Sequence, residues 1–368
     1  MTNIKIGISS PAERFLRPDL GIIVFRLRPD RCPYTVAMHM ADALVSATVG
    51  GGFWILSGGS LAHCSHALRR EANDAKVPLM GVLGAFVFAA QMVNFAIPGT
   101  GSSGHLGGGL LLTVLLGPQA AVLVMGSVLL MQALFFADGG LLAFGCNLFN
   151  MGIVPAFVAY PLMYRPLAKR GWLGGAAVSG ALLALQLGAL GVVLETMFSG
   201  LAGLPFKPFL VSMLAIHLPI GLVEGIVTAA LLGFVGKVRP VLLEKGAEES
   251  GRRLLAVFLG LAMLAGGLFS WATSARPDGL EWSVARTSRA AETAAPEAGL
   301  RSIFHRVQQR TSVLPEYTFP IPGDGAFKRV GTSLSGLLGG ALVIGLITCM
   351  GWLVAWRRKS NLIHKVRS

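Results

Sequence analysis

The chain has 368 residues, of which 53% are hydrophobic and only 13% are charged, so it lacks the polar side chains that would cover a soluble globule of this length. The formal net charge is +13, but the Lys and Arg residues lie in short segments between apolar runs and form no continuous stripe, which argues against nucleic-acid binding. Four scattered cysteines form no CxxC pair and predict neither a disulfide framework nor a zinc site. We therefore expect an all-α, polytopic helix bundle integral to a membrane.

Residues 1–37 form a basic segment broken by four prolines. Its apolar run, Leu20 to Phe25, is too short for a secretory signal, which needs an uninterrupted apolar core of about 7–15 residues. We expect residues 1–37 to be a disordered leader, or a segment upstream of a true start at Met38.

Apolar runs begin at Ala43, and most have roughly the 17–25 residues that a helix needs to cross a bilayer. The third run is short and glycine-rich, which predicts a tilted or partly re-entrant segment joined to the next at Gly117-Pro118. The predicted spans are 43–62, 77–97, 106–117, 119–137, 141–163, 173–199, 208–236, 253–273 and 332–356. We expect about seven transmembrane helices in residues 38–240 and two in residues 241–368.

Positive charge orients these spans. Lys and Arg cluster after the first, fifth, seventh and ninth spans, whereas the opposite short loops carry almost none apart from Lys207. Cytoplasmic loops are enriched in Lys and Arg, so the C-terminus is predicted to be cytoplasmic, whereas Met38, His39 and the loop 97–106 lie outside. The sixty or so polar residues 274–331 between the last two spans also fall outside, and we expect them to be loosely ordered.

Met38 and His39 suggest a metal chelate. If the chain starts at Met38, its free α-amine, the His39 amide nitrogen and the His39 imidazole Nδ1 close two chelate rings around one ion. His105, predicted to lie at the same membrane depth, is the candidate for a fourth nitrogen. Square-planar nitrogen ligation suits Ni(II) or Cu(II) and can hold Co(II). The alternative is that Met38 is an internal methionine and His39 caps a helix.

Other polar groups at membrane depth allow different functions. His217 and Glu224 lie seven residues apart on one helical face and could serve a metal-independent secondary transporter, or simply hydrogen-bond between helices. The sequence Gly101-Ser102-Ser103-Gly104 matches the GxSG pattern of intramembrane serine proteases, with His217 as the imaginable base. However, the pattern is common in a glycine-rich chain, and Ser103 falls in a loop. Asn147 and Asn150 could reach a site or bond neighbouring helices.

Five motifs in chain order resemble the CbiM/NikM family. They are Met38-His39-Met40-Ala41-Asp42, the segment 91–99 (QMVNFAIPG), Ser103-Gly104-His105-Leu106, the segment 144–152 (FGCNLFNMG), and 217–221 (HLPIG) with Glu224. The segment 277–282 (PDGLEW) resembles the accessory NikN/CbiN subunit. The chain is similar to a fused protein with a CbiM/NikM part in residues 38–240 and a NikN/CbiN part in residues 241–368.

The resemblance implies a substrate-specific S component of an energy-coupling-factor (ECF) importer for nickel or cobalt in the cell inner membrane. It implies the metal ligands Met38, His39 and His105, no enzymatic activity, no organic cofactor, and a transmembrane coupling protein with ATPase subunits as partners. Consistently, the sequence has no GxxxxGK[ST] loop for ATP. The family usually continues Ile-Pro-Asp-Gly after its first histidine, whereas this chain has Met40 and Ala41 before Asp42 and Ala43 after it, which affects the loop rather than the ligands. A planar four-nitrogen site favours nickel over cobalt.

Overall fold

The computed structural model describes residues 12–17, 22–27, 39–71, 73, 76–201, 203–238, 251–288, 299–319 and 325–367, and separates the chain into two units, 1–35 and 36–368. In the first unit, β1 (Ala12–Arg17) pairs antiparallel with β2 (Ile22–Leu27), with Ala12 opposite Leu27. Regular structure is therefore present in a segment that we expected to be a disordered leader. The β-branched and aromatic residues of β2 (IIVFRL) have a high propensity for strands, which explains the pairing.

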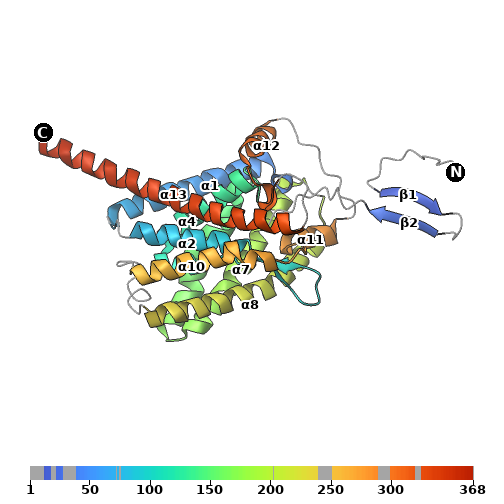
Figure 1. The fold of residues 1–368 in the computed structure, drawn as a ribbon, viewed down its shortest axis with the longest axis horizontal. Helices are drawn as coiled ribbons and strands as arrows, with labels where there is room; N and C mark the ends of the chain where they lie inside the picture. The colour runs from blue at the N-terminus through green and yellow to red at the C-terminus, as the bar shows by residue number, and fades with distance from the viewer. Residues whose placement is uncertain are drawn as a thin grey trace. The chain divides into compact units, whose positions relative to one another are not determined.

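The second unit is built almost entirely from helices (Figure 1). Its elements in chain order are η1 (Asp42–Leu44), α1 (Ala47–Glu71), α2 (Lys76–Gln91), β3 (Phe95–Ala96), β4 (Ser103–Gly104), α3 (Gly109–Leu116), α4 (Pro118–Phe136), α5 (Phe144–Leu148), the π-helical η2 (Phe149–Ile153) and η3 (Pro155–Tyr164), α6 (Arg165–Lys169), α7 (Leu173–Ser199), α8 (Phe206–Val238), α10 (Arg252–Gly267), η4 (Phe269–Ala272), α11 (Gly279–Thr287), α12 (Leu300–Thr311), η5 (Pro315–Tyr317) and α13 (Gly325–Arg367). The expectation of an all-α membrane bundle is confirmed.

Five helical stretches among the described residues are long and apolar enough to cross a bilayer. They are Pro118–Phe136, Phe144–Lys169, Leu173–Ser199, Phe206–Lys237 and Ala326–Trp356. The other four predicted spans also coincide with helices, but α2, α3 and α10 are shorter than a full crossing and α1 is less apolar. As predicted, α3 is only eight residues long and meets α4 at Gly117, whose φ of 83° is open to glycine.

Helices α2, α10 and α13 pack side by side, so the C-terminal part is built onto the first part (Figure 1). Glycines allow the closest approaches. A Cβ atom on Gly336 of α13 would lie 2.5 Å from the Cα of Gly266 in α10. Helices α7 and α8 also approach closely, since a Cβ on Gly225 of α8 would lie 2.5 Å from the Cα of Val178 in α7. Backbone against backbone at this distance leaves no room for a side chain.

Gly336→Ala is expected to destabilise the packing of α10 against α13 by about 1–3 kcal/mol, because overpacking forces backbone to move. The measurement is the thermal unfolding midpoint of the purified protein in detergent. Gly345→Ala in the same helix is the matched control, since nothing lies within 4 Å of its added Cβ. Equal midpoints for the two variants would show that α10 and α13 are not held this closely.

The described parts of residues 274–331 are ordered against the membrane bundle, contrary to the loose order expected from sequence. Asp278 caps α11 through a capping box with Glu281, so the segment Pro277-Asp278-Gly279 opens a helix. Docking combines single polar contacts to backbone carbonyls with a few side chains buried in the core of the bundle, such as Leu314 and Tyr317. Trp282 Nε1 donates to Thr100 O at 2.9 Å, and Gln308 Nε2 donates to Gly139 O at 2.7 Å. A scan for apolar periodicity misses order of this kind.

Candidate metal site

The segment that follows His39 is clamped by α5. The Met40 N–H donates to Asn147 Oδ1 and Asn147 Nδ2 donates to the Met40 carbonyl, both at 3.1 Å. The same carbonyl accepts the Gly140 N–H at 3.0 Å. Both backbone groups of Met40 are thus satisfied inside the protein, which fixes the position from which His39 projects.

Two glycines after α4 make room for this segment. A Cβ atom on Gly140 would overlap Asp42 Oδ1, and one on Gly139 would lie 2.9 Å from His39 Cβ. Gly139 also has a φ of 77°, which side chains rarely adopt. Asp42 in turn accepts the Ala143 N–H at 2.9 Å, and burial raises the pKa of its carboxyl. The turn therefore lets two chain segments pass almost in backbone contact.

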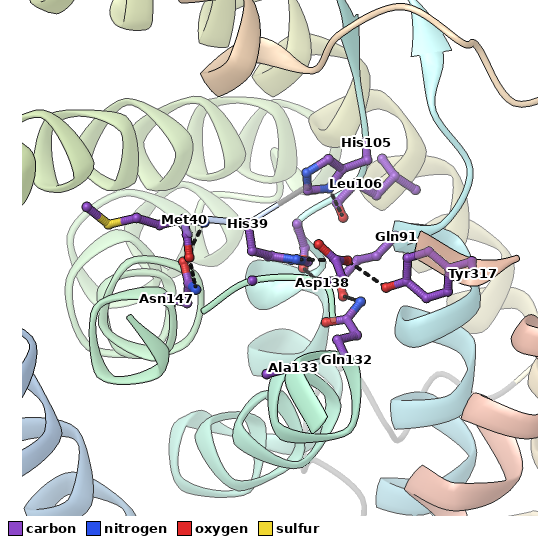
Figure 2. A network of polar contacts seen from close by, with 12 residues as sticks. His39, Met40, Gln91, His105, Leu106, Gln132, Ala133, Asp138, Asn147 and Tyr317 are labelled. Atoms are coloured by element: carbon purple, nitrogen blue, oxygen red, sulfur yellow. Dashed lines mark hydrogen bonds and ion pairs between the residues drawn. The ribbon is translucent and has the colours of Figure 1, made fainter. Parts of the chain in front are cut away.

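His39 and His105 meet at the centre of the site (Figure 2). Their ring centroids are 5.5 Å apart and the rings are tilted by 55°. His39 is only 3% exposed, and neither of its buried ring nitrogens has a hydrogen-bond partner of acceptable geometry. His105 is half-buried, with its Nδ1 3.3 Å from Leu106 O, an arrangement that favours the tautomer with its lone pair on Nε2. Both rings line one cavity of about 110 Å³.

Asp138 lies against His39. Its Oδ2 is 3.1 Å from His39 Nδ1 and accepts the hydroxyl of Tyr317 at 2.6 Å (Figure 2). Burial acts to raise the pKa of Asp138, but the charge and contact of His39 and the Tyr317 hydroxyl outweigh it and hold that pKa below its ordinary value. Burial and the adjacent carboxylate raise the pKa of Tyr317, so its hydroxyl is a proton donor at neutral pH. A charged carboxylate therefore stands beside the two histidines.

Glu224 braces the loop that carries His105. Its two oxygens accept the N–H groups of Gly107 and Gly108 at 2.7 and 3.0 Å. His217, which also lines the cavity, has its Nδ1 2.7 Å from Met213 O. With both oxygens bound to backbone amides, Glu224 has a structural role, which disfavours its use as a proton carrier.

Ser103 and Asn150 also have structural partners. The hydroxyl of Ser103 donates to the carbonyl of Arg276 at 2.8 Å, so it helps to seat the C-terminal part instead of facing a base. Asn150 donates to Glu195 of α7 at 2.8 Å and thus forms an interhelical bond at the wall of the cavity. Asn147 does reach the site, through the backbone of Met40.

The structure brings His39 and His105 together, while Met38, the third predicted ligand, lies outside the described residues. In the described part of the chain, no group of three or more His, Cys, Asp or Glu side chains could hold a metal ion. Sequence analysis missed Asp138 and Tyr317. A signal was present for the first of them: Ala137-Asp138-Gly139-Gly140 places a carboxylate and two glycines just after an apolar helix, at the predicted depth of His39.

Comparisons with known proteins cover both parts of the chain. Residues 39–242 match CbiM, described as the cobalt uptake substrate-specific transmembrane region, and residues 252–356 match the PDGLE domain. The fused nickel transport protein NikMN of Rhodobacter capsulatus is 33% identical over 360 residues, which cover 88% of this chain and 100% of that protein. A putative fused nickel transport protein NikMN of Archaeoglobus fulgidus is 34% identical over 311 residues, covering 84% and 96%. The cobalt transport protein CbiM of Sorangium cellulosum is 35% identical over 226 residues, covering 56% and 95%.

Proposed function

Because the chain belongs to the CbiM family of substrate-specific transmembrane proteins and carries a PDGLE domain behind it, we propose that it is the substrate-binding component of an ATP-driven ECF importer for nickel or cobalt ions. As its family indicates, it is a multi-pass membrane transport protein and not an enzyme. Family membership shows that the chain is a membrane transport protein. We propose its energy source, its metal ligands and its orientation in the membrane.

The proposed ligands are the α-amine of Met38, the amide and Nδ1 nitrogens of His39, and Nε2 of His105. One observation carries this assignment: two histidines 66 positions apart meet with ring centroids 5.5 Å apart on one cavity, and Nε2 of the buried one lacks a hydrogen-bond partner. Buried polar groups normally have partners, so a buried imidazole nitrogen without one, on a cavity shared with a second histidine, points to a ligand. Metal–imidazole bonds are about 2.0–2.1 Å long, which rings at this separation can supply on one ion.

Nδ1 of His39 contacts Asp138 in this structure, so the ring must turn about its Cβ–Cγ bond to join the chelate. His39 lines the cavity of about 110 Å³ into which its ring would turn. Planar nitrogen ligation favours nickel, and cobalt shares the site's chemistry.

Orientation and partners follow the same proposal. The distribution of Lys and Arg supports a metal site and residues 274–331 on the extracytoplasmic face, with the C-terminus in the cytoplasm. ATPase subunits and a transmembrane coupling protein would supply the energy, as the family resemblance implies. The sequence contains no GxxxxGK[ST] motif for ATP, which fits a subunit that binds the metal while its partners bind ATP.

The proposed chelate is tested by determining the first residue of the functional protein. We expect the metal-loaded protein in the membrane to begin at Met38, because only a free amine there completes two chelate rings. N-terminal sequencing and metal analysis on the same purified sample would measure this. A form with residues 1–37 held in place by an uncleavable fusion is the control and should lose tight nickel binding. An intact Met1 on a protein that binds nickel tightly through His39 would refute the chelate.

A further inference from the structure

A buried polar chain links the C-terminal part to the proposed ligand His39. Tyr317 in η5 donates its hydroxyl to Asp138 Oδ2 at 2.6 Å, and the same oxygen lies 3.1 Å from His39 Nδ1 (Figure 2). Tyr317, Asp138 and His39 are 7%, 3% and 3% exposed, so all three are shielded from bulk water. Of these three linked side chains, Tyr317 is the one that belongs to the PDGLE domain.

The position of Tyr317 is fixed from several sides. Its ring stacks on Phe136 at the end of α4, with centroids 5.1 Å apart, and meets Phe88 of α2 edge-on at 6.1 Å. Its backbone is left-handed, with φ of 59°, and that of Glu316 has φ of 53°. Non-glycine residues adopt this conformation at an energetic cost, and it persists where the surroundings enforce it, often at functional positions. The hydroxyl is thus held on Asp138 by a strained turn and an aromatic cluster.

The contact between Asp138 and His39 bears directly on ion loading. Nδ1 is the His39 nitrogen that can close a six-membered ring with the amide, and it is the nitrogen that Asp138 contacts. When the ion takes Nδ1, the buried carboxylate loses that partner, and a buried charge without a partner is unfavourable. The Tyr317 hydroxyl, which donates to this carboxylate in the structure, would then remain as a partner of the buried charge.

We propose that Tyr317 is a positioning residue for metal binding, which holds the Asp138 carboxylate in place so that His39 can turn from it to the ion. This inference rests on the proposed chelate. It assigns the PDGLE domain a hydrogen bond to the residue directly behind a ligand. Tyr317 does not touch the ion and acts through Asp138.

The experiment is a double-mutant cycle on the purified full chain, with the dissociation constant for Ni²⁺ alone as the readout. The variants are Tyr317→Phe, Asp138→Asn and both together. Loss of a group behind a metal ligand typically weakens affinity about 10–100-fold, and we expect Tyr317→Phe to raise the Kd by this amount. In the Asp138→Asn background the same change should alter the Kd less than about twofold, because the charge that the hydroxyl stabilises is gone.

Two controls separate this inference from the proposed function. Tyr160→Phe removes a hydroxyl away from Asp138 and should leave the Kd unchanged. His105→Ala removes a proposed ligand and should abolish tight binding, so a parent that binds nickel only when His105 is present establishes the site independently of Tyr317. Thermal unfolding of each variant reports its fold.

Three results would overturn the inference while leaving the proposed site intact. In the first, Tyr317→Phe binds nickel like the parent. In the second, it weakens binding equally in both backgrounds, so it does not act through Asp138. In the third, it fails to fold, which would make the hydroxyl a structural group. As a further check, Tyr317→His keeps a ring with an N–H donor and should recover part of the affinity that Tyr317→Phe loses.

Discussion

Replacing His105 with alanine is expected to reduce nickel and cobalt uptake to background while the protein still folds in the membrane. The substitution removes one of four proposed nitrogen ligands, and the chelate from Met38 and His39 cannot close the square alone. His105 is half-buried and its Nδ1 lies 3.3 Å from the carbonyl of the next residue, so its removal costs little packing. Uptake of radioactive metal into cells, normalised to protein in the membrane, measures the effect.

His66→Ala is the matched control, since His66 lies on α1, outside the cavity that His105 lines. It should transport like the parent. If His105→Ala also imports metal at the parental rate, the ion is bound elsewhere. A protein that no longer inserts would be recognised by its loss from the membrane fraction.

Uptake is expected to stop when the partner ATPase is inactivated and to continue when the proton gradient is collapsed while ATP is maintained. The reason is that binding by neutral nitrogens captures the ion but supplies no energy for import. A secondary transporter using Glu224 would behave in the opposite way, yet both oxygens of Glu224 are already bound by the amides of Gly107 and Gly108. The measurement is uptake into cells with an uncoupler or with an inactive ATPase.

Uptake is also expected to weaken as the external pH falls. Imidazole must be neutral to bind, with a reference pKa near 6.5, and the α-amine, with a reference pKa near 8, must lose its proton as well. Protons therefore compete with the ion for these nitrogens as the pH falls. Measuring the same cells at two external pH values completes the design. Uptake that followed the proton gradient and ignored the ATPase would favour a secondary transporter.

The pairing of His39 with His105 is predictable because membrane topology is readable from sequence. Apolar runs give the spans and positive charges orient them, so composition alone places two distant histidines at one depth. The shortness of the third run likewise predicts a tilted or partly re-entrant segment, and α3 is a short helix that ends at Leu116, next to Gly117. These inferences depend on the average composition of many residues, so the exact packing of individual side chains does not affect them.

Asp138 and Tyr317 cannot be paired in this way. They lie 179 positions apart, and their hydrogen bond depends on how η5 docks onto the end of α4. The segments around Tyr317 are seated by isolated contacts: single bonds to backbone carbonyls, such as Thr311 Oγ1 to Leu134 O at 2.8 Å, and the buried side chains of Leu314 and Tyr317. Single polar contacts of this kind leave no repeating pattern in a sequence.

The weakness of those docking bonds explains what is gained by joining the two parts in one polypeptide. Each hydrogen bond from Trp282, Gln308 or Thr311 contributes only about 0.5–1.5 kcal/mol net. In a continuous chain the second part meets the first at an effective concentration that is in the millimolar range for short linkers. A few such bonds then act together with the stacking of Tyr317 on Phe136 and the packing of α10 and α13 on α2 to keep Tyr317 in place. Two separate polypeptides with the same contacts would instead depend on their abundance in the membrane, and occupancy of the Asp138 contact would vary with expression level.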